Sequence, residues 1–515
     1  MKESLKPIDL SNHVQQGIEH ICYSVDRGQN CRPYFRFNLT NPPIWSQHEP
    51  GDTPHTVGRF LHALNLCREI AGLPNDPELL HGLRKHLFRS CKKGDGFAWD
   101  DMGYTPNPPL IFMHHQREAL LGLVAIWQIL EEDQAAKNYA KALVTAIDVA
   151  TKENGTFPQA CLGQDGWQKE NLAPTTSGRL ISALITYNRI FNDPLGLEIA
   201  RRFAQQILDD CFREDGQLTT AAGTHIHSIT GTVSSLAELG LLISEKEFID
   251  RAKLVFDVGL LPYRTQTGWV KESLNAKLGR GEANCTSDLI EAACLLGTAG
   301  YTSYFEDAER MLRNHLLASQ MNDLSWVTEN EEIPNTEIHA YDNLYQRAFG
   351  AFCFAEPNGF HSYNSDLTGA ALQGIAVTWE HIITHKDKSV CVNLLLSKDH
   401  HIAHIDSQMP KMDCITIVPK RNVNLSVRIP PWCDYDAIAI TVEGDKTPVV
   451  FRDNYLWLNN LYSGTKVQIT FPQPRFLTQE RALGYENTYR VQWQGNTVLA
   501  MSGSGQWMAL YPKLD

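Results

Sequence analysis

Carboxylates and histidines stand at loop ends, directly before segments with a helical pattern. The carboxylates are Glu272, Glu282 and Asp366. Two carboxyl groups can cleave a glycosidic bond, because one protonates the departing oxygen while the other attacks the sugar or activates water. The three positions therefore predict sugar hydrolysis. Residue types alone leave epimerisation and polysaccharide elimination open.

Further polar segments occupy equivalent places and are candidates for substrate binding. They are Asp52 and His55, His114-His115, Thr175 to Gly178, His225-Ile-His227, and Trp269 with Asn284. Histidines can donate hydrogen bonds to sugar hydroxyls, and the indole face of Trp269 suits stacking on a sugar ring. Each residue also has a structural alternative. Asp52 and Asp366 could cap helices, and the paired histidines and Trp269 could serve packing.

The first three quarters of the chain are predicted to form helical hairpins. Leu120, Leu123, Val124, Trp127 and Leu130 recur at helical spacing, and similar groups follow along the chain. Short polar turns between helices recur every 52 to 60 residues, near positions 75, 132, 192, 244 and 300. A period of this size indicates a repeated helix pair. With the first and last helices included, we expect about twelve helices.

Twelve paired helices can form an open solenoid or six hairpins closed into an (α/α)6 barrel. Long segments rich in Gly, Trp, His and Asp lie between the hairpins, such as Gly94 to Asp101 and Gly155 to Pro174. Long loops gathered at one end of a scaffold typically build a binding site. We therefore expect a mainly α chain whose residues 1–388 form an (α/α)6 barrel with the catalytic site at one mouth.

From about Ser389 the pattern changes to short runs rich in β-branched residues, separated by turns such as Pro430-Pro431 and Ser463-Gly464. Residues 389–515 are predicted to form an antiparallel β-sandwich. No low-complexity linker divides the two parts, so we expect the sandwich to pack firmly on the barrel.

Composition excludes several classes of partner. The net charge is −13 with no basic block, so neither nucleic acid nor an anionic membrane is expected. No run of about eighteen apolar residues predicts a membrane span, and Met1 to Gln16 lack a signal-peptide pattern, which predicts a cytoplasmic protein. The twelve cysteines form no Cys-x-x-Cys pair and are expected to be free, buried thiols.

Several segments resemble the β-L-arabinofuranosidases of glycoside hydrolase family 127 in the broad sense. They include Gly281-Glu-Ala-Asn-Cys-Thr-Ser-Asp-Leu-Ile290, Asp366-Leu-Thr-Gly369 and Ser426-Val-Arg-Ile-Pro-Pro-Trp432, in the family's order along most of the chain. The resemblance implies a helical barrel followed by β-sandwich material. Gly268-Trp-Val-Lys-Glu272 is similar to the family's Gly-Trp-Val-Pro-Glu, whose glutamate acts as acid and base, and His225-Ile-His227 resembles its substrate-contacting segment.

The chain departs from that family where the family binds zinc. The family's zinc ligands are a Glu-x-Cys pair and a later Cys-Cys pair, with one thiolate as nucleophile. Here Glu282 is kept, but Asn284 replaces the first cysteine, and Asp366 and Leu367 replace the pair. Loss of three thiolates removes a soft tetrahedral site. We expect no zinc and no cofactor. A shift to Cys285 and a hard site for Ca²⁺ or Mg²⁺ remain as alternatives.

These observations predict a glycosidase that removes a terminal sugar, arabinofuranoside-like, from plant or algal oligosaccharides. Glu272 is the expected acid, its pKa raised by an apolar wall that includes Trp269. Asp366 is the expected nucleophile or base, Glu282 a supporting carboxylate, and His225 and His227 donors to hydroxyls. The alternatives are a non-catalytic carbohydrate-binding protein and a lyase or epimerase on the same barrel.

Overall fold

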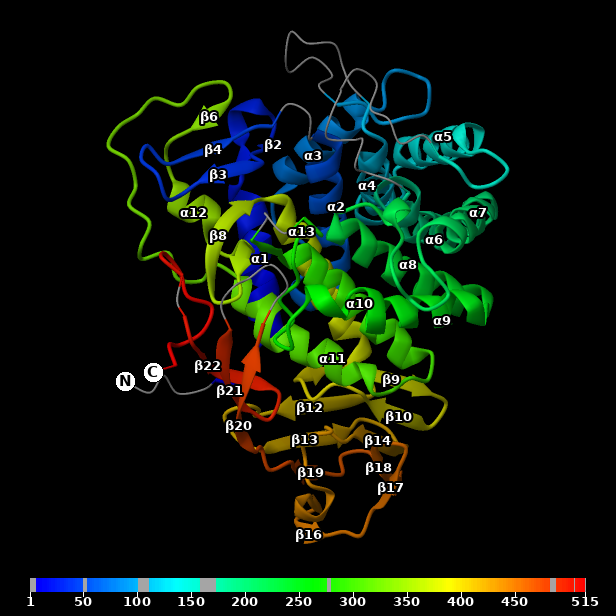
Figure 1. Ribbon diagram of the computed structural model, residues 1–515, viewed down its shortest axis with the longest axis vertical. Helices are drawn as coiled ribbons and strands as arrows, with labels where there is room; N and C mark the ends of the chain where they lie inside the picture. The colour runs from blue at the N-terminus through cyan, green and yellow to red at the C-terminus, as the bar shows by residue number, and fades with distance from the viewer. Residues whose placement is uncertain are drawn as a thin grey trace.

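A computed structural model describes residues 6–49, 53–100, 111–157, 173–275, 279–481, 488–503 and 505–514 (Figure 1). Asp52, which the sequence nominates for substrate binding, lies outside these ranges, as does Cys161. The other cysteines are free, and most of them are buried. The structure is mainly helical in its first part and carries several β-sheets.

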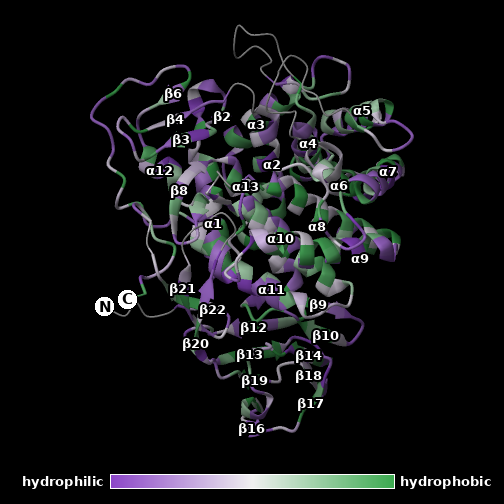
Figure 2. Ribbon diagram, viewed as in Figure 1, coloured by the Kyte–Doolittle hydropathy of each residue, from purple (hydrophilic) through white to green (hydrophobic). Residues whose placement is uncertain are grey.

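Six helices pack side by side in sequence, and the last packs against the first. They are α2 (Thr53–Ala71), α4 (Gln116–Ile129), α6 (Arg179–Phe191), α8 (Ile226–Ile243), α10 (Ala283–Thr298) and α13 (Asp366–His381). Each contacts a helix that follows or precedes it in the chain: α3 (Pro77–Ser90), α5 (Gln134–Ala150), α7 (Leu195–Asp210), α9 (Lys246–Leu254), α11 (Tyr304–Met311) and, for α13, α1 (Leu10–Tyr23). Figure 2 shows hydrophobic and hydrophilic residues sharing these helices, as expected of helices with one buried side.

Two kinds of connection join the helices. Short turns follow α4, α6, α8 and α10, and Glu132, Asn192, Ser244 and Gly300 take left-handed conformations there. These are the turns expected from the sequence period. Much longer segments lead back from the paired helices to the starts of α4, α6, α8, α10 and α13. The amino-terminal ends of the six packed helices therefore meet the long segments, and the short turns lie at the other ends.

Close packing within the ring depends on glycine. A Cβ atom on Gly58 of α2 would lie 2.1 Å from the carbonyl oxygen of Glu118 on α4, and one on Gly122 would lie 2.7 Å from the Cα of Gly58. The two backbones approach so closely that no side chain fits between them.

A six-stranded antiparallel sheet, not expected from the sequence, lies beside the helices. Its order is β5 (Gly281–Glu282), β7 (Phe354–Glu356), β8 (Gly359–Asn364), β3 (Arg36–Asn38), β4 (Trp45–Gln47) and β6 (His339–Ala340). β5 ends directly before α10, and β8 ends two residues before α13. The sheet therefore fixes where Glu282 and Asp366 enter their helices. The short helix α12 (Leu344–Ala348) and the pair β1 (Val25–Asp26) and β2 (Arg32–Pro33) lie nearby in the chain.

Strands replace helices immediately after α13. One sheet has the order β17 (Val450–Arg452), β18 (Tyr455–Leu461), β14 (Val423–Arg428), β10 (Ser389–Val392), β9 (Ile383–Lys386). A second has the order β11 (Lys398–Asp399), β12 (Ala403–Ser407), β13 (Cys414–Pro419), β19 (Val467–Thr470), β15 (Ala439–Val442), β16 (Asp445–Lys446). β10 and β14 pair in parallel, which differs from the purely antiparallel expectation. A third sheet contains β20 (Arg475–Glu480), β21 (Tyr489–Gln494) and β22 (Thr497–Met501).

Buried charges connect the helices to these strands. Arg428 of β14 is 2% exposed and donates to Glu306 (2.6 Å) and Glu309 (2.5 Å) of α11. Glu309 also accepts from the backbone N–H of Leu395 at 2.8 Å. One hydrophobic core runs through both parts, so the strand region packs firmly on the helices.

Helix α8 is long and apolar enough to cross a membrane by composition alone. Here 78% of that segment is buried, because α8 is one of the six packed helices. Its apolarity is explained by its place in the core.

Candidate active site

The amino-terminal ends of α2, α4, α6, α8, α10 and α13 bring polar side chains together around Glu118. This residue of α4 is fully buried, and its Oε1 atom accepts from Arg59 (3.3 Å), Arg117 (2.9 Å) and Arg179 (2.5 Å). Burial favours the neutral acid, but Arg179, His55 and the other two arginines hold the pKa of Glu118 well below its usual value. Glu118 is therefore the fixed anion of the site.

Arg59 of α2 connects most of the other groups. It donates from Nε to His55 and from Nη2 to His227, both at 3.0 Å, and its Nε lies 4.0 Å from Asp366 Oδ2. Asp366 is the first residue of α13, is 6% exposed, and follows Ser365 at the helix N-cap. Asp366 therefore faces the arginine that also holds His227.

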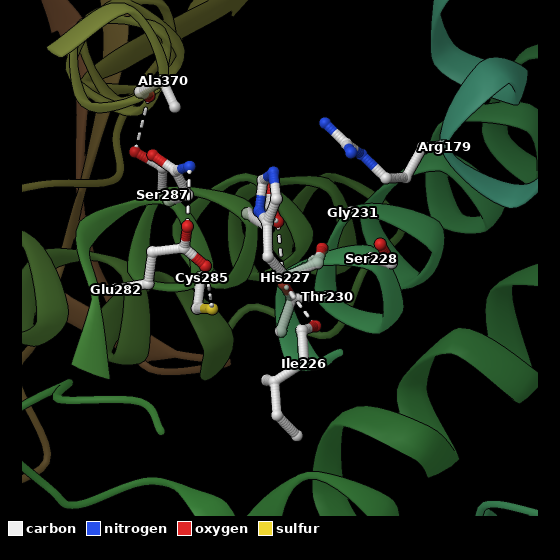
Figure 3. A network of polar contacts seen from close by, with 12 residues as sticks. Arg179, Ile226, His227, Ser228, Thr230, Gly231, Glu282, Cys285, Ser287 and Ala370 are labelled. Atoms are coloured by element: carbon white, nitrogen blue, oxygen red, sulfur yellow. Dashed lines mark hydrogen bonds and ion pairs between the residues drawn. The ribbon is translucent and has the colours of Figure 1, made fainter. Parts of the chain in front are cut away.

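His227 lies between the acidic and the basic parts of the site, as Figure 3 shows. Its Nε2 accepts from Arg59, and its Nδ1 lies 3.0 Å from Asp288 Oδ2 of α10. Asp288 also accepts from the Thr230 hydroxyl at 2.7 Å, and burial raises the pKa of Asp288 to about 6. The Nε2 atom of His227 is thus held by Arg59, and its Nδ1 atom faces a carboxylate without a hydrogen bond within the described residues.

Glu282 is a buried carboxyl group whose surroundings disfavour its ionised form. It ends β5, is 6% exposed, and accepts from Asn284 (3.2 Å) and from the Cys285 thiol (3.6 Å). Burial raises the pKa of Glu282 well above its usual value, and the charges of Glu272 and Asp366 add to this effect. The charges of Glu272 and Asp366, the other two carboxylates nominated by the sequence, therefore both act on Glu282.

Glu272 is held in an ion pair. Arg280 donates to both of its carboxylate oxygens, one of them at 2.9 Å. The Glu272 carbonyl accepts from the N–H of Ile226, which fixes this segment to the start of α8. His225 stands at the N-cap of α8, with its Nδ1 2.8 Å from the Ser228 hydroxyl, and burial lowers its pKa to about 4.

Trp269 cannot have the sugar-stacking role that the sequence analysis predicted for it. Its indole is fully buried in a hydrophobic cluster, and its Nε1 donates to the carbonyl of Ala355 in β7 at 2.7 Å. A ring without exposed surface cannot stack on a sugar. Trp269 instead anchors its segment to the sheet that carries Glu282.

Three histidine rings lie together at the start of α2 and α4. The rings of His55 and His115 stack at 4.9 Å, and the ring of His114 meets that of His115 edge to face at 4.0 Å. Burial lowers the pKa of His55 to about 4 and that of His114 well below its usual value. His55 and His114 therefore offer neutral imidazoles near neutral pH.

The described residues do not fit the zinc site that the sequence resemblance would require. His227, Glu282 and Cys285 have ligand atoms within 4.8 Å of one another. However, the Arg59 guanidinium occupies His227 Nε2, and the Cys285 thiol donates to Glu282. Leu367, in place of a cysteine, is fully buried and offers no ligand.

Known protein families and curated proteins give no match to the sequence. Solved structures do. A GH127 β-L-arabinofuranosidase from Geobacillus stearothermophilus T6 superposes with a TM-score of 0.60 and 14% identity, over 87% of this chain and 80% of that one. The chain has the fold of the GH127 arabinofuranosidases. A second GH127 β-arabinofuranosidase superposes with a TM-score of 0.62 and 14% identity, over 95% of this chain and 79% of that one.

The same helical fold extends beyond hydrolases. A sugar epimerase from a ruminal bacterium superposes with a TM-score of 0.51 and 9% identity, over 72% of this chain and 98% of that one. At these identities the likeness concerns the fold, which agrees with the resemblance drawn from sequence.

Sequence reasoning missed the charged residues inside the helices. Glu118, Arg59, Arg179 and Asp288 stand within or at the start of helices rather than in the long loops. The sequence does carry one indication of these residues: each is a charged residue within an apolar helical segment, and such a residue needs a partner when it is buried. Pairing Arg117-Glu118 with Arg59 and Arg179 across helices required the structure.

Proposed function

We propose that this protein is a glycoside hydrolase that removes a terminal sugar, arabinofuranoside-like, from plant or algal oligosaccharides. In this proposal the ring of helices in residues 1–388 is an (α/α)6 barrel that carries the site, and residues 389–515 form a β-sandwich. The likeness in fold to GH127 enzymes supports the architecture. The chemistry rests on the residues of the site.

The observation that carries the proposal is a buried carboxyl group, Glu282, at the start of α10, with a second, Asp366, at the start of α13. Burial raises the pKa of Glu282, and the charges of Glu272 and Asp366 add to this effect. Glycoside hydrolysis needs one carboxyl group protonated and another ionised at the same pH. An arrangement in which burial and neighbouring anions keep one acid neutral meets that need.

The structure favours Glu282 over Glu272 as the acid. The sequence analysis expected an apolar wall around Glu272, but Glu272 is ion-paired with Arg280, and that pair uses the carboxylate form. Glu282 lacks such a partner in the ion pairs of the described residues. We assign Glu282 to donate its proton to the glycosidic oxygen as that bond breaks. Asp366, facing Arg59, attacks the anomeric carbon or takes a proton from water.

The proposal involves no metal. Its steps need a proton donor and an ionised carboxylate, which the chain supplies, and the donor set around Cys285 does not suit zinc. His225 and His227 remain our candidates for hydrogen bonding to substrate hydroxyls, together with the neighbouring His55, His114 and His115.

Leaving-group dependence tests the acid assignment. Nitrophenyl glycosides barely need protonation of the departing oxygen, whereas oligosaccharides do. Glu282→Gln should therefore lower kcat/KM about 10²–10⁴-fold on oligosaccharides and far less on nitrophenyl glycosides. Asp366→Asn should lower both by similar factors. If Glu282→Gln lowered kcat/KM equally on both kinds of substrate, the acid role would be rejected. If the unmodified protein released no sugar, hydrolysis itself would be rejected.

Sugar epimerisation is the second candidate, favoured by the neutral histidines. Imidazoles that stay neutral at pH 7, such as His55 and His225, can take a proton next to a carbonyl group. Epimerisation would convert free reducing sugars without releasing new reducing ends. Proton exchange into a sugar in D₂O, followed by nuclear magnetic resonance, distinguishes it from hydrolysis.

A further inference from the structure

Three guanidinium groups converge on one carboxylate oxygen at the centre of the site. Arg59, Arg117 and Arg179 are 5%, 7% and 3% exposed and share a single oxygen of Glu118. Asp366 lies near Arg59 and offsets part of this charge. Arg117 and Arg179 have no ion pair other than that with Glu118 among the described residues.

Arg179, like Arg117, has hydrogen-bond donors that no group within the described residues takes up. It stands at the first turn of α6, and its one hydrogen bond within the described residues joins Nη2 to Glu118 Oε1. An arginine carries five N–H donors, so Nε and Nη1 retain theirs. Figure 3 shows the guanidinium extending toward His227 from the side opposite to Glu282. Burial, together with Arg117 and Arg59, lowers the pKa of Arg179 to about 10, and Glu118 and Asp288 oppose this effect.

We propose that Arg179 binds a carboxylate of the substrate, so that the sugar held beside Glu282 is a uronic acid or another acidic sugar. This inference rests on the proposed function and specifies its substrate class. A guanidinium pairs with a carboxylate through two parallel hydrogen bonds, and such charge-assisted bonds are stronger than those to neutral hydroxyls. Among the other arginines, Arg280 binds Glu272, Arg59 binds His55, Glu118 and His227, and Arg117 binds Glu118.

The neutral histidines make this selectivity sharper. His55, His114, His225 and His227 all have lowered pKa values because of burial, so near neutral pH they carry no charge that could bind an anion. They can still hydrogen-bond to hydroxyls. Recognition of an anion would therefore depend on Arg179, whereas recognition of hydroxyls is spread over several rings.

Binding measurements test the inference without relying on catalysis. Isothermal titration calorimetry would compare galacturonate and glucuronate with galactose, glucose and the methyl ester of galacturonic acid. The ester keeps the shape of the sugar and removes its charge. We expect uronates to bind about tenfold to hundredfold more tightly than the ester. Arg179→Gln should abolish this preference, and Arg179→Lys should retain part of it, because lysine keeps the charge without the planar fork.

Arg189→Gln is the matched control. Arg189 lies on the same helix, is exposed at its far end and pairs with Glu238, so its removal should leave the preference unchanged. Equal binding of uronate and ester to the unmodified protein would overturn the inference, and so would a preference that survives in Arg179→Gln. If neutral oligosaccharides are cleaved and uronates are not preferred, the proposed hydrolysis is supported and the carboxylate site is rejected. If uronates bind through Arg179 but no glycoside is cleaved, the carboxylate site is supported and the proposed hydrolase activity is rejected.

Discussion

Glu272 and Glu282 carry the same functional group, but their surroundings differ. Glu272 is paired with Arg280, whereas Glu282 accepts from Asn284 and the Cys285 thiol, and the charges of Glu272 and Asp366 help to raise its pKa. Glu282 is therefore suited to act as an acid beside an ionised Asp366. The difference comes from the residues around each group, since the two side chains are chemically identical.

Cys285 tests whether the site uses a thiolate or a metal. Because its thiol is buried and protonated, Cys285→Ser should leave kcat/KM on oligosaccharides within about threefold of the parent, far from the 10²–10⁴-fold cost of losing an acid or base. Elemental analysis of the same samples should find less than one zinc per chain. A full equivalent of zinc that disappears in Cys285→Ser would contradict this prediction.

His315 tests the effect of buried neutral histidines on stability. Burial lowers its pKa to about 3, so below its ordinary value of 6.5 the unfolded chain takes up a proton that the folded chain does not. Stability is therefore lost as the pH falls from about 6.5 toward 3, by up to about 1.4 kcal/mol per pH unit for this group. His315→Gln should flatten the decline in denaturation free energy between pH 6.5 and 5. His404→Gln, at an exposed position, should not.

The sequence identified the residues that stand beside loops and missed those inside helices. Glu272, Glu282, Asp366 and the two histidines of the 225–227 segment were recognisable because loop-to-helix junctions rarely need such side chains for packing. Glu118 could not be recognised in this way, since its partners come from helices about 60 residues before and after it in the chain. Pairing at that separation is decided by packing, which residue types do not reveal.

Helix periodicity predicted the hairpins well, because each helix buries one side and repeats that pattern. The turns near Glu132, Asn192, Ser244 and Gly300 are where the period placed them. The sheet that carries β5 and β8 escaped prediction, since its strands are two to six residues long and come from distant parts of the chain. Strands so short leave little alternation to detect.

The crossing of α2 and α4 gives a prediction at the level of helix packing. A methyl group on Gly58 would meet the Glu118 carbonyl oxygen at 2.1 Å, so Gly58→Ala must separate the helices. We expect a loss of about 1–3 kcal/mol in the free energy of unfolding. Gly231→Ala on α8 is the control, because its nearest neighbour would lie 3.4 Å away and alanine favours helix. Denaturant unfolding of both variants measures the difference, and equal stability would contradict the prediction.

Across the whole molecule, the buried pairing of Arg428 with Glu306 and Glu309 joins the strand region to the helices. Arg428→Ala leaves buried Glu306 without its ion-pair partner and Glu309 with Arg313 alone, which should cost about 3–5 kcal/mol. Calorimetry should then resolve two transitions where the parent shows one. Arg452→Ala removes an exposed pair with Asp453 and should change stability by less than about 1 kcal/mol. A single unshifted transition in Arg428→Ala would show that the two parts are held together by other contacts.

Contact between α13 and α2 has a consequence for synthesis on the ribosome. The ring cannot close until residues 366–381 have been made, although α2 is complete at residue 71. At about 5–20 residues per second, the side of α2 that meets α13 stays uncovered for roughly 15–60 s. A nascent chain in this state presents apolar surface to chaperones and to other chains. Truncation before residue 366 should therefore yield aggregated protein, even though most of the ring is present.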